Sequence, residues 1–308
     1  MKRILKGLVY TVGGLLLLVF IGATAVYGLS ESRMGKRYVV NPPALAIPTD
    51  SASIARGEHL ARSIAGCTDC HGPNLEGRAV IDDPALGRVF AKNLTSGKGG
   101  IGGTLRDVDY VRAIRHGFDP DGKPLKVMPS SDYANLADDD LAAIIAFVKS
   151  RPPVDKEVPA VTLGPVGRAL LVGGKLPILH AERIDHAKPH VQPVPVARTA
   201  ECGKYLVTFG CQGCHGPTLA GGHIAEGPPD WPPAANLTPS GPTQSWTEKD
   251  FRKLLREGKR PDGSPVSEVM PWKSIGHLTD DEIRAMYLYL RTVPAAATPG
   301  LKAPVSGS

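Results

Sequence analysis

The residues with the clearest chemistry in this 308-residue chain form two copies of one short motif. "GCTDCHG" occupies residues 66–72 and "GCQGCHG" occupies residues 210–216. In each copy a histidine directly follows two cysteines that stand three positions apart, which is the attachment signature of c-type haem. Two thiols at this spacing can reach both vinyl groups of one porphyrin, and the next residue then directs an imidazole nitrogen at the iron. The motifs predict two covalently bound haem c groups.

The predicted attachment residues and histidine ligands are Cys67, Cys70, His71, Cys211, Cys214 and His215. A zinc site would need a second Cys or His pair about 12–20 residues away, whereas 141 positions separate Cys70 from Cys211. A thioredoxin-like redox pair would need a βαβ setting and no obligatory histidine. The residue pattern therefore favours haem over both alternatives, and Cys202 is expected to be a free thiol.

Each copy also offers a sixth ligand for iron at a matched place. Met128 lies 57 residues after His71 and Met270 lies 55 residues after His215, and a proline follows each methionine. Methionine is normally a core filler, but these two stand in the best-matched loop of a chain with only five methionines. We expect both to ligate iron, because a His–Met pair is a known cytochrome c arrangement.

The remaining histidines offer weaker alternatives. His116 and His277 could displace the methionines and give bis-histidine haems, but neither has a histidine counterpart in the other copy, so we expect surface or supporting positions. His180, His186 and His190 lie between the two copies, where a metal cluster is an open alternative.

A long internal repeat surrounds the motifs, at an offset of 141 to 146 residues. "GEHL" pairs with "GKYL", and "RHGFDPDGKPLKVMP" pairs with "REGKRPDGSPVSEVMP". Each copy predicts a helix before the haem motif (54–65 in the first), a middle helix (107–116 and 248–257) and a terminal helix. The second terminal helix opens on a capping box of Thr279 and Glu282, with Met286 on its apolar face. No alternating pattern predicts a strand of useful length, so the expected fold is all-α.

The matched sequons at Asn93 and Asn236 are repeated within the two copies. Because they recur inside the repeated unit, we expect turn-forming hydrogen bonds from these side chains rather than glycosylation.

An apolar run of 22 residues, Leu8 to Leu29, follows three basic residues at the N-terminus. The run is long enough to cross a bilayer, and the basic residues would keep the N-terminus in the cytoplasm. A cleaved secretory signal is the alternative, because Ala23 and Ala25 form an A-x-A site. We favour a retained anchor, because the run exceeds the usual apolar region of a signal peptide. Either way, the rest of the chain is placed on the periplasmic side of a bacterial cytoplasmic membrane.

The formal charge of +6 lies mostly outside the repeated units, each of which is close to neutral. A nucleic-acid-binding face is therefore not expected on either unit. The predicted organisation is a signal-anchor helix, a first domain, a Pro/Gly-rich connector with a short apolar helix followed by stiff extended chain, and a second domain. The predicted boundaries are 1–35, 50–155, 156–198 and 199–300.

The sequence around both motifs resembles class I c-type cytochromes, especially the multihaem cytochrome subunits of membrane-bound alcohol and gluconate dehydrogenases. The similarity covers roughly residues 53–153 and 199–294, and rests on "GCTDCHG", "NLTSGKGGIGG", "RHGFDPDGKPL", "VMPSSDY" and their second-half partners. The resemblance implies two all-helical domains whose C-x-x-C-H and methionine residues bind haem and carry electrons from a catalytic subunit toward a quinone or oxidase. This chain has two haem motifs, where those subunits resemble three-module proteins.

The sequence thus predicts two tandem class I cytochrome c-like domains behind a transmembrane helix. Their expected role is electron relay and not catalysis, with a dehydrogenase, an oxidase or a small cytochrome as redox partner. The alternative is a dihaem enzyme of the peroxidase or thiosulfate-oxidising type, in which one haem has a displaceable ligand. The matched Met-Pro loops argue against such an asymmetry.

Overall fold

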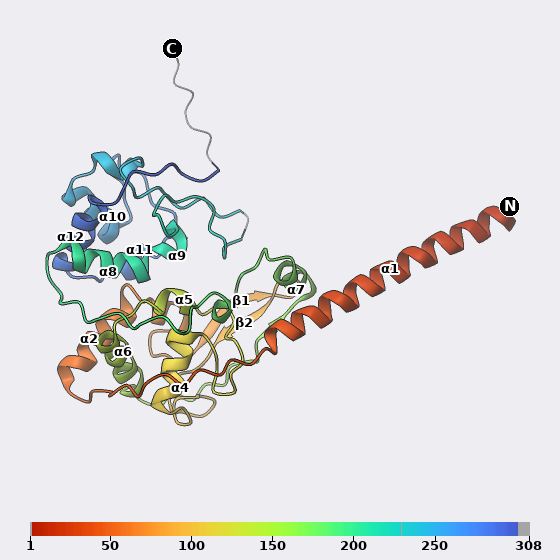
Figure 1. Ribbon diagram of the computed structural model, residues 1–308, viewed down its shortest axis with the longest axis horizontal. Coiled ribbons are helices and arrows are strands. Elements are labelled where there is room, and N and C mark those ends of the chain that lie inside the picture. Colours follow the sequence, from red (N-terminus) through yellow and green to blue (C-terminus); the bar gives the residue numbers. More distant parts are fainter. Residues whose placement is uncertain (1, 229, 301–308) are drawn as a thin grey trace, which may run out of the picture.

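The computed structural model describes residues 2–228 and 230–300 of the chain. A long helix, α1 (Lys2–Met34), projects away from two helical lobes that lie one above the other (Figure 1). Length and composition allow α1 to cross a membrane, since its apolar window has a mean hydropathy of 2.2 and none of that window is buried. The expected apolar N-terminal helix is therefore present.

The two lobes repeat the same order of helices. The first contains α2 (Ser51–Arg62), α3 (Cys67–His71), β1 (Arg78–Asp83), β2 (Gly87–Ala91), α4 (Asp107–Val111), the π-helix η1 (Arg112–His116), α5 (Ser130–Tyr133) and α6 (Asp138–Lys149). The second contains α8 (Ala200–Gly210), α9 (Gln212–His215), the 3-10 helix η3 (Pro242–Ser245), α10 (Glu248–Glu257), α11 (Trp272–Ile275) and α12 (Asp280–Leu290). Between them lie β3 (Thr162–Leu163), α7 (Pro165–Val172) and the 3-10 helix η2 (His180–Glu182).

In each lobe the first and last helices cross at a glycine. A Cβ at Gly57 in α2 would lie 1.9 Å from the carbonyl oxygen of Ala143 in α6. A Cβ at Gly203 in α8 would lie 1.9 Å from the carbonyl oxygen of Ala285 in α12. These distances leave no room for a side chain, so the glycines of "GEHL" and "GKYL" allow the helix backbones to touch. The predicted helix repeat is confirmed, as is the burial of Met286.

A small antiparallel sheet in the order β1-β2-β3 is the one element class that the sequence did not predict. Arg78 pairs with Ala91, Asp83 pairs with Gly87, and the register shifts between Ala79 and Ile81. The expectation that no strand would form was wrong because β1 is almost wholly exposed and β2 and β3 are only five and two residues long, so no long hydrophobic alternation marks them. The chain remains mostly helical.

The repeated Asn-Leu-Thr segments are structural, as predicted. Asn93 is fully buried, and its side-chain amide donates to the carbonyl of Val154 at 2.8 Å. Asn236 makes the matching bond to the carbonyl of Ala296 at 2.7 Å. Each asparagine thereby fixes the chain that follows the terminal helix of its own lobe.

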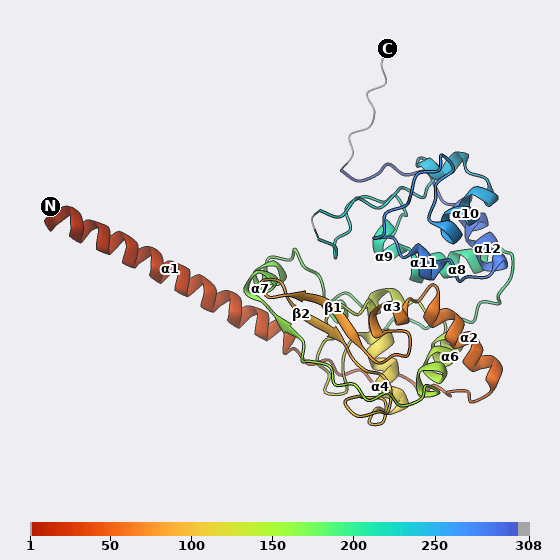
Figure 2. The same ribbon diagram turned by 180° about the vertical axis from the view of Figure 1, so that it is seen from behind.

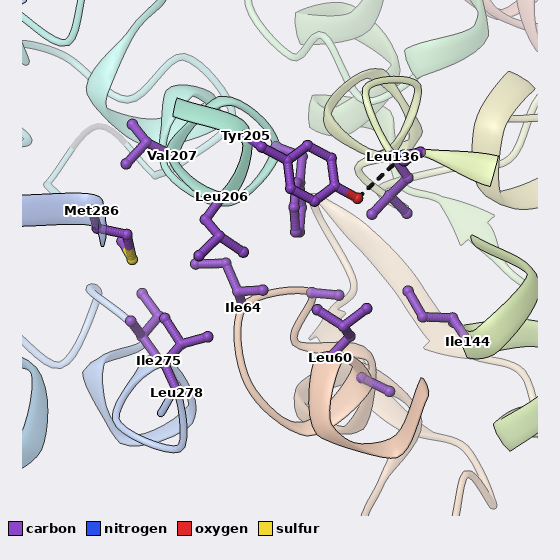
Figure 3. Packing of buried hydrophobic residues seen from close by; sticks show 14 of the residues in the cluster. Leu60, Ile64, Leu136, Ile144, Tyr205, Leu206, Val207, Ile275, Leu278 and Met286 are labelled. Carbon is purple, nitrogen blue, oxygen red and sulfur yellow. Dashed lines mark hydrogen bonds between the residues drawn. The ribbon is translucent and has the colours of Figure 1, made fainter. Parts of the chain in front are cut away.

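The two lobes share one continuous hydrophobic core. Ile64 of the first lobe lies between Leu60 and Leu206, the latter from α8 of the second lobe (Figure 3). A Cβ at Gly210 would lie 2.3 Å from the Cγ1 atom of Ile64, so the glycine before the second haem motif leaves space for the other lobe. Tyr205 of α8 donates its hydroxyl proton to Asp140 of α6 at 2.9 Å.

Charged side chains reinforce the same boundary. Glu282 in α12 is 1% exposed and accepts hydrogen bonds from Arg56 and His59 of α2, both at 2.7 Å. Burial opposes ionisation of this carboxyl, but bonds from His59, from the backbone of Thr279 and from Arg56 outweigh it and lower its pKa to about 2. Glu282 is also the capping-box residue of α12, as predicted.

The connector packs against the inner end of α1, and Figure 2 shows its helix α7 beside that end. Arg168 of α7 lies 4.0 Å above the ring of Tyr27 and donates to the hydroxyl of Ser30 at 2.8 Å. Arg33 forms a bidentate ion pair with the carboxylate of Glu182 in η2. The predicted short apolar helix of the connector is confirmed as α7 and packs on α1.

Candidate haem sites

Both cysteine-histidine motifs fold as short helices directly after the first helix of their lobe. Gly66 precedes α3 in the left-handed region (φ +57°), and Gly72 follows it at φ +84°. Gly216 repeats the second feature at φ +77°. These glycines let the chain turn sharply on either side of the first motif and after the second.

The histidine of each motif is held in one tautomer. Nδ1 of His71 lies 2.8 Å from the carbonyl oxygen of Lys92, and Nδ1 of His215 lies 2.8 Å from that of Ala235. A carbonyl can only accept, so Nδ1 carries the proton and Nε2 keeps its lone pair. Burial lowers the pKa of both imidazoles, which favours the neutral form. Each histidine is thus prepared to offer Nε2 to a metal.

None of the four motif cysteines forms a disulfide. Burial, together with the neighbouring cysteine, raises the pKa of Cys67 to about 12, and the same causes raise that of Cys211 to about 12. The raised pKa values mean that these two thiols are protonated near neutral pH when no group is attached.

A cavity of about 200 Å³ lies beside the second motif. Cys211, Cys214, His215 and Met270 all line it, and most of the other lining side chains are apolar, among them Ile224, Trp246, Phe251, Leu254, Val266 and Leu290. This donor set has one imidazole, one thioether and two adjacent thiols around an apolar space. Such a set fits a covalently attached haem with His–Met coordination.

In the first lobe, Met128 and Cys67 pack against the same hydrophobic core. Met128 follows Val127, whose φ of +71° is unusual for a β-branched residue. The backbone N–H of Val127 donates to the carbonyl of Ile178 in the connector at 2.9 Å. The first methionine loop is therefore fixed by a segment that sequence reasoning had not connected to it.

The motif helix of each lobe lies against the methionine-loop helix of the other lobe. Ser274 of α11 donates to Asp69 of α3 at 2.6 Å. At the corresponding contact, a Cβ on Gly213 of α9 would lie 2.4 Å from a carboxylate oxygen of Asp132 in α5. This reciprocal arrangement brings the two candidate sites together at the lobe boundary.

His116 and His180 have side-chain partners inside the fold. His116 is 5% exposed, so of the two expected positions it takes a supporting one and not a surface one, and its Nδ1 lies 3.1 Å from Nδ1 of His186. His277 is exposed, in agreement with prediction. His180 is buried between Ser131 and Glu226. Within residues 2–228 and 230–300, no group of three or more His, Cys, Asp or Glu side chains could hold a metal ion.

Sequence reasoning missed the residues that join the lobes. Arg56 aligns with Cys202 in the repeat, and His59 aligns with Tyr205. Two similar lobes that pack against each other need different residues at the positions that form the contact. Aligned positions with unlike residue types, such as these, therefore indicate the surface between the lobes. Such differences were the available signal for the ion pairs at Glu282.

Residues 54–152 and 200–294 both match the cytochrome c family. The chain belongs to the cytochrome c family. It is 30% identical over 312 residues to a diheme cytochrome c-type protein of Cereibacter sphaeroides, an alignment that covers 92% of this chain and 97% of that protein. This cytochrome is accordingly a dihaem electron-transfer protein with two cytochrome c domains.

Dehydrogenase subunits are also similar to it. The chain is 33% identical over 276 residues to the fructose dehydrogenase cytochrome subunit of Gluconobacter japonicus, covering 80% of this chain and 54% of that subunit. It is 29% identical over 279 residues to the gluconate 2-dehydrogenase cytochrome c subunit of Pantoea cypripedii, covering 80% and 60%. The chain thus spans little more than half the length of these subunits.

Proposed function

We propose that each domain carries one His–Met haem. Thioethers form at Cys67 and Cys70 in the first domain, with His71 and Met128 as iron ligands. Cys211 and Cys214 attach the second haem, with His215 and Met270 as ligands. The carbonyl bonds that fix both histidine tautomers, and the cavity shared by the second set, support this assignment.

The proposed role is the relay of single electrons between a dehydrogenase and a later acceptor. A bound haem supplies the couple between ferric and ferrous iron, and a thioether ligand favours the ferrous state. The reciprocal contacts of α3 with α11 and of α9 with α5 support electron transfer directly between the domains. The named dehydrogenase subunits among its relatives support a dehydrogenase as the electron donor.

The proposed location is the periplasmic face of the cytoplasmic membrane, with α1 as a retained anchor. The exposed apolar surface of α1 supports this placement. The contacts of α1 with the connector would hold the haem domains close to the bilayer.

Co-purification from native membranes tests the relay. The solubilised cytochrome should bring down a dehydrogenase, and the substrate of that enzyme should reduce both haems. Turnover of peroxide or thiosulfate by the isolated cytochrome, with a high-spin signal from one haem, would instead establish the dihaem enzyme.

A further inference from the structure

One segment of the connector, residues 176–186, runs along the methionine loop of the first domain; we call it the strap. The strap accepts the Val127 backbone N–H at the carbonyl of Ile178. Farther along, Nδ1 of His180 accepts a hydrogen bond from the Ser131 hydroxyl at 2.7 Å. Nε2 of His180 faces Glu226 at 3.2 Å, which leaves Nδ1 as the accepting nitrogen. The strap thus holds the loop on both sides of Met128.

The backbone next to Met128 is strained. Val127 has a φ of +71°, and a β-branched residue in this left-handed region is destabilised by contacts of its Cβ with the backbone. Such a conformation persists only where its surroundings impose it. Here the side chain of Val127 packs against a separate hydrophobic cluster, and the strap supplies the hydrogen bond. The cluster consists of Met34, Leu163, Leu171, Ile178 and Leu179.

Among the described residues, no hydrogen bond joins the connector to the second methionine loop, whose contact with the first domain is the bond from Ser274 of α11 to Asp69 at 2.6 Å. The backbone N–H of Met270 donates to the carbonyl of Ser267 at 3.1 Å. Lys273 stands where Ser131 stands in the first loop, and it pairs with Glu268 at the protein surface. No residue before Met270 in this loop has the positive φ found at Val127. The two matched loops therefore differ in how firmly the chain constrains them.

We propose that the strap is a positioning element for Met128, and that it makes the first methionine harder to displace from iron than the second. The inference rests on the proposed His–Met ligation of both haems. Val127, Ser131 and His180 would act on a bound haem through the position of Met128. The matching methionines of the sequence thus belong to loops of unequal rigidity.

Imidazole titration of the oxidised holoprotein, in detergent and with the full chain, tests the inference. Imidazole replaces a thioether on ferric haem, and the near-infrared thioether-to-iron band then disappears. We expect two phases, and Met270→His should abolish the one at lower imidazole concentration. Complete absence of the band in the wild type would refute the His–Met assignment itself. A single phase, or displacement of Met128 before Met270, would refute only the claim that the strap makes Met128 harder to displace.

Ser131→Ala supplies the matched variant test. Loss of this partly buried hydrogen bond should shift the high-concentration phase to about tenfold lower imidazole. The control Lys273→Ala, at the corresponding position of the second loop, should leave both phases unchanged. Val127→Ala keeps the backbone donor and still places a Cβ in the left-handed region, but it removes most of the side-chain anchor in the hydrophobic cluster, so it should shift the same phase in the same direction. Unchanged phases in both the Ser131 and the Val127 variant would overturn the proposal.

Discussion

His116 is the histidine whose environment differs most from what the sequence indicated. Its side chain is almost fully buried and bonds to His186, and the charges of Arg115, His190 and Arg112 also lie nearby. Burial, followed by these groups, lowers its pKa to about 4 from an ordinary value of 6.5. Protonation inside the fold is therefore unfavourable.

This shift predicts an acid-sensitive contribution to stability. A depressed pKa means that the unfolded chain binds the proton first, so the contribution is complete above pH 6.5 and is lost as the pH falls toward 4. Between pH 7.5 and pH 4.5, His116 should account for about 2 kcal/mol of lost unfolding free energy. Urea denaturation at both pH values, compared with His116→Asn, measures it. Equal losses in the two proteins would contradict the assignment.

The residues proposed to bind haem could be proposed from the sequence because porphyrin chemistry fixes their types and spacing. Cys67, Cys70 and His71 must be neighbours in the chain, so a local motif suffices to find them. The contacts of Val127 and Glu282 join segments far apart in the chain, and no local pattern encodes them. Burial of His116 likewise depends on the connector folding back onto the first domain.

At the scale of elements, the crossings of α2 with α6 and of α8 with α12 depend on one glycine each. Gly203→Ala would place a methyl carbon against the backbone of Ala285, so α8 and α12 must separate. We expect a loss of about 1–3 kcal/mol in unfolding free energy, as for overpacked cores. Gly103→Ala is the control, because a Cβ there would meet only ordinary contacts of 3.6 Å or more. Thermal unfolding measures the stability of both variants. An equal decrease in the two would contradict the proposed role of Gly203 in the helix crossing.

The helices were predictable because amphipathic spacing and caps are local features. The capping box of Thr279 and Glu282 and the middle helix at 248–257 both appear where the sequence placed them. The sheet was not predictable from local sequence, because β3 pairs with β2 only after the connector has turned back along the first domain. Elements that need a distant partner leave little trace in a single stretch of sequence.

At the scale of the whole molecule, the proposed role of α1 is to hold the haem domains at the membrane. Its contacts with the connector begin at Tyr27, after the candidate cleavage site at Ala25, so they persist in either processed form. We predict that the mature protein keeps a residue close to Met1 and stays in the membrane after a salt wash. N-terminal sequencing of the membrane fraction measures this. A soluble protein that begins near Val26 would instead establish a cleaved signal.

The central claim is that both domains hold low-spin His–Met haems used for electron transfer alone. The most direct measurement is the intensity of the near-infrared thioether-to-iron band in the oxidised protein, per mole of covalently bound haem. The account predicts an intensity equal to two thioether-ligated haems per chain, from Met128 and Met270, with no high-spin signal. An intensity equal to one haem, accompanied by a high-spin signal from the other, would contradict it.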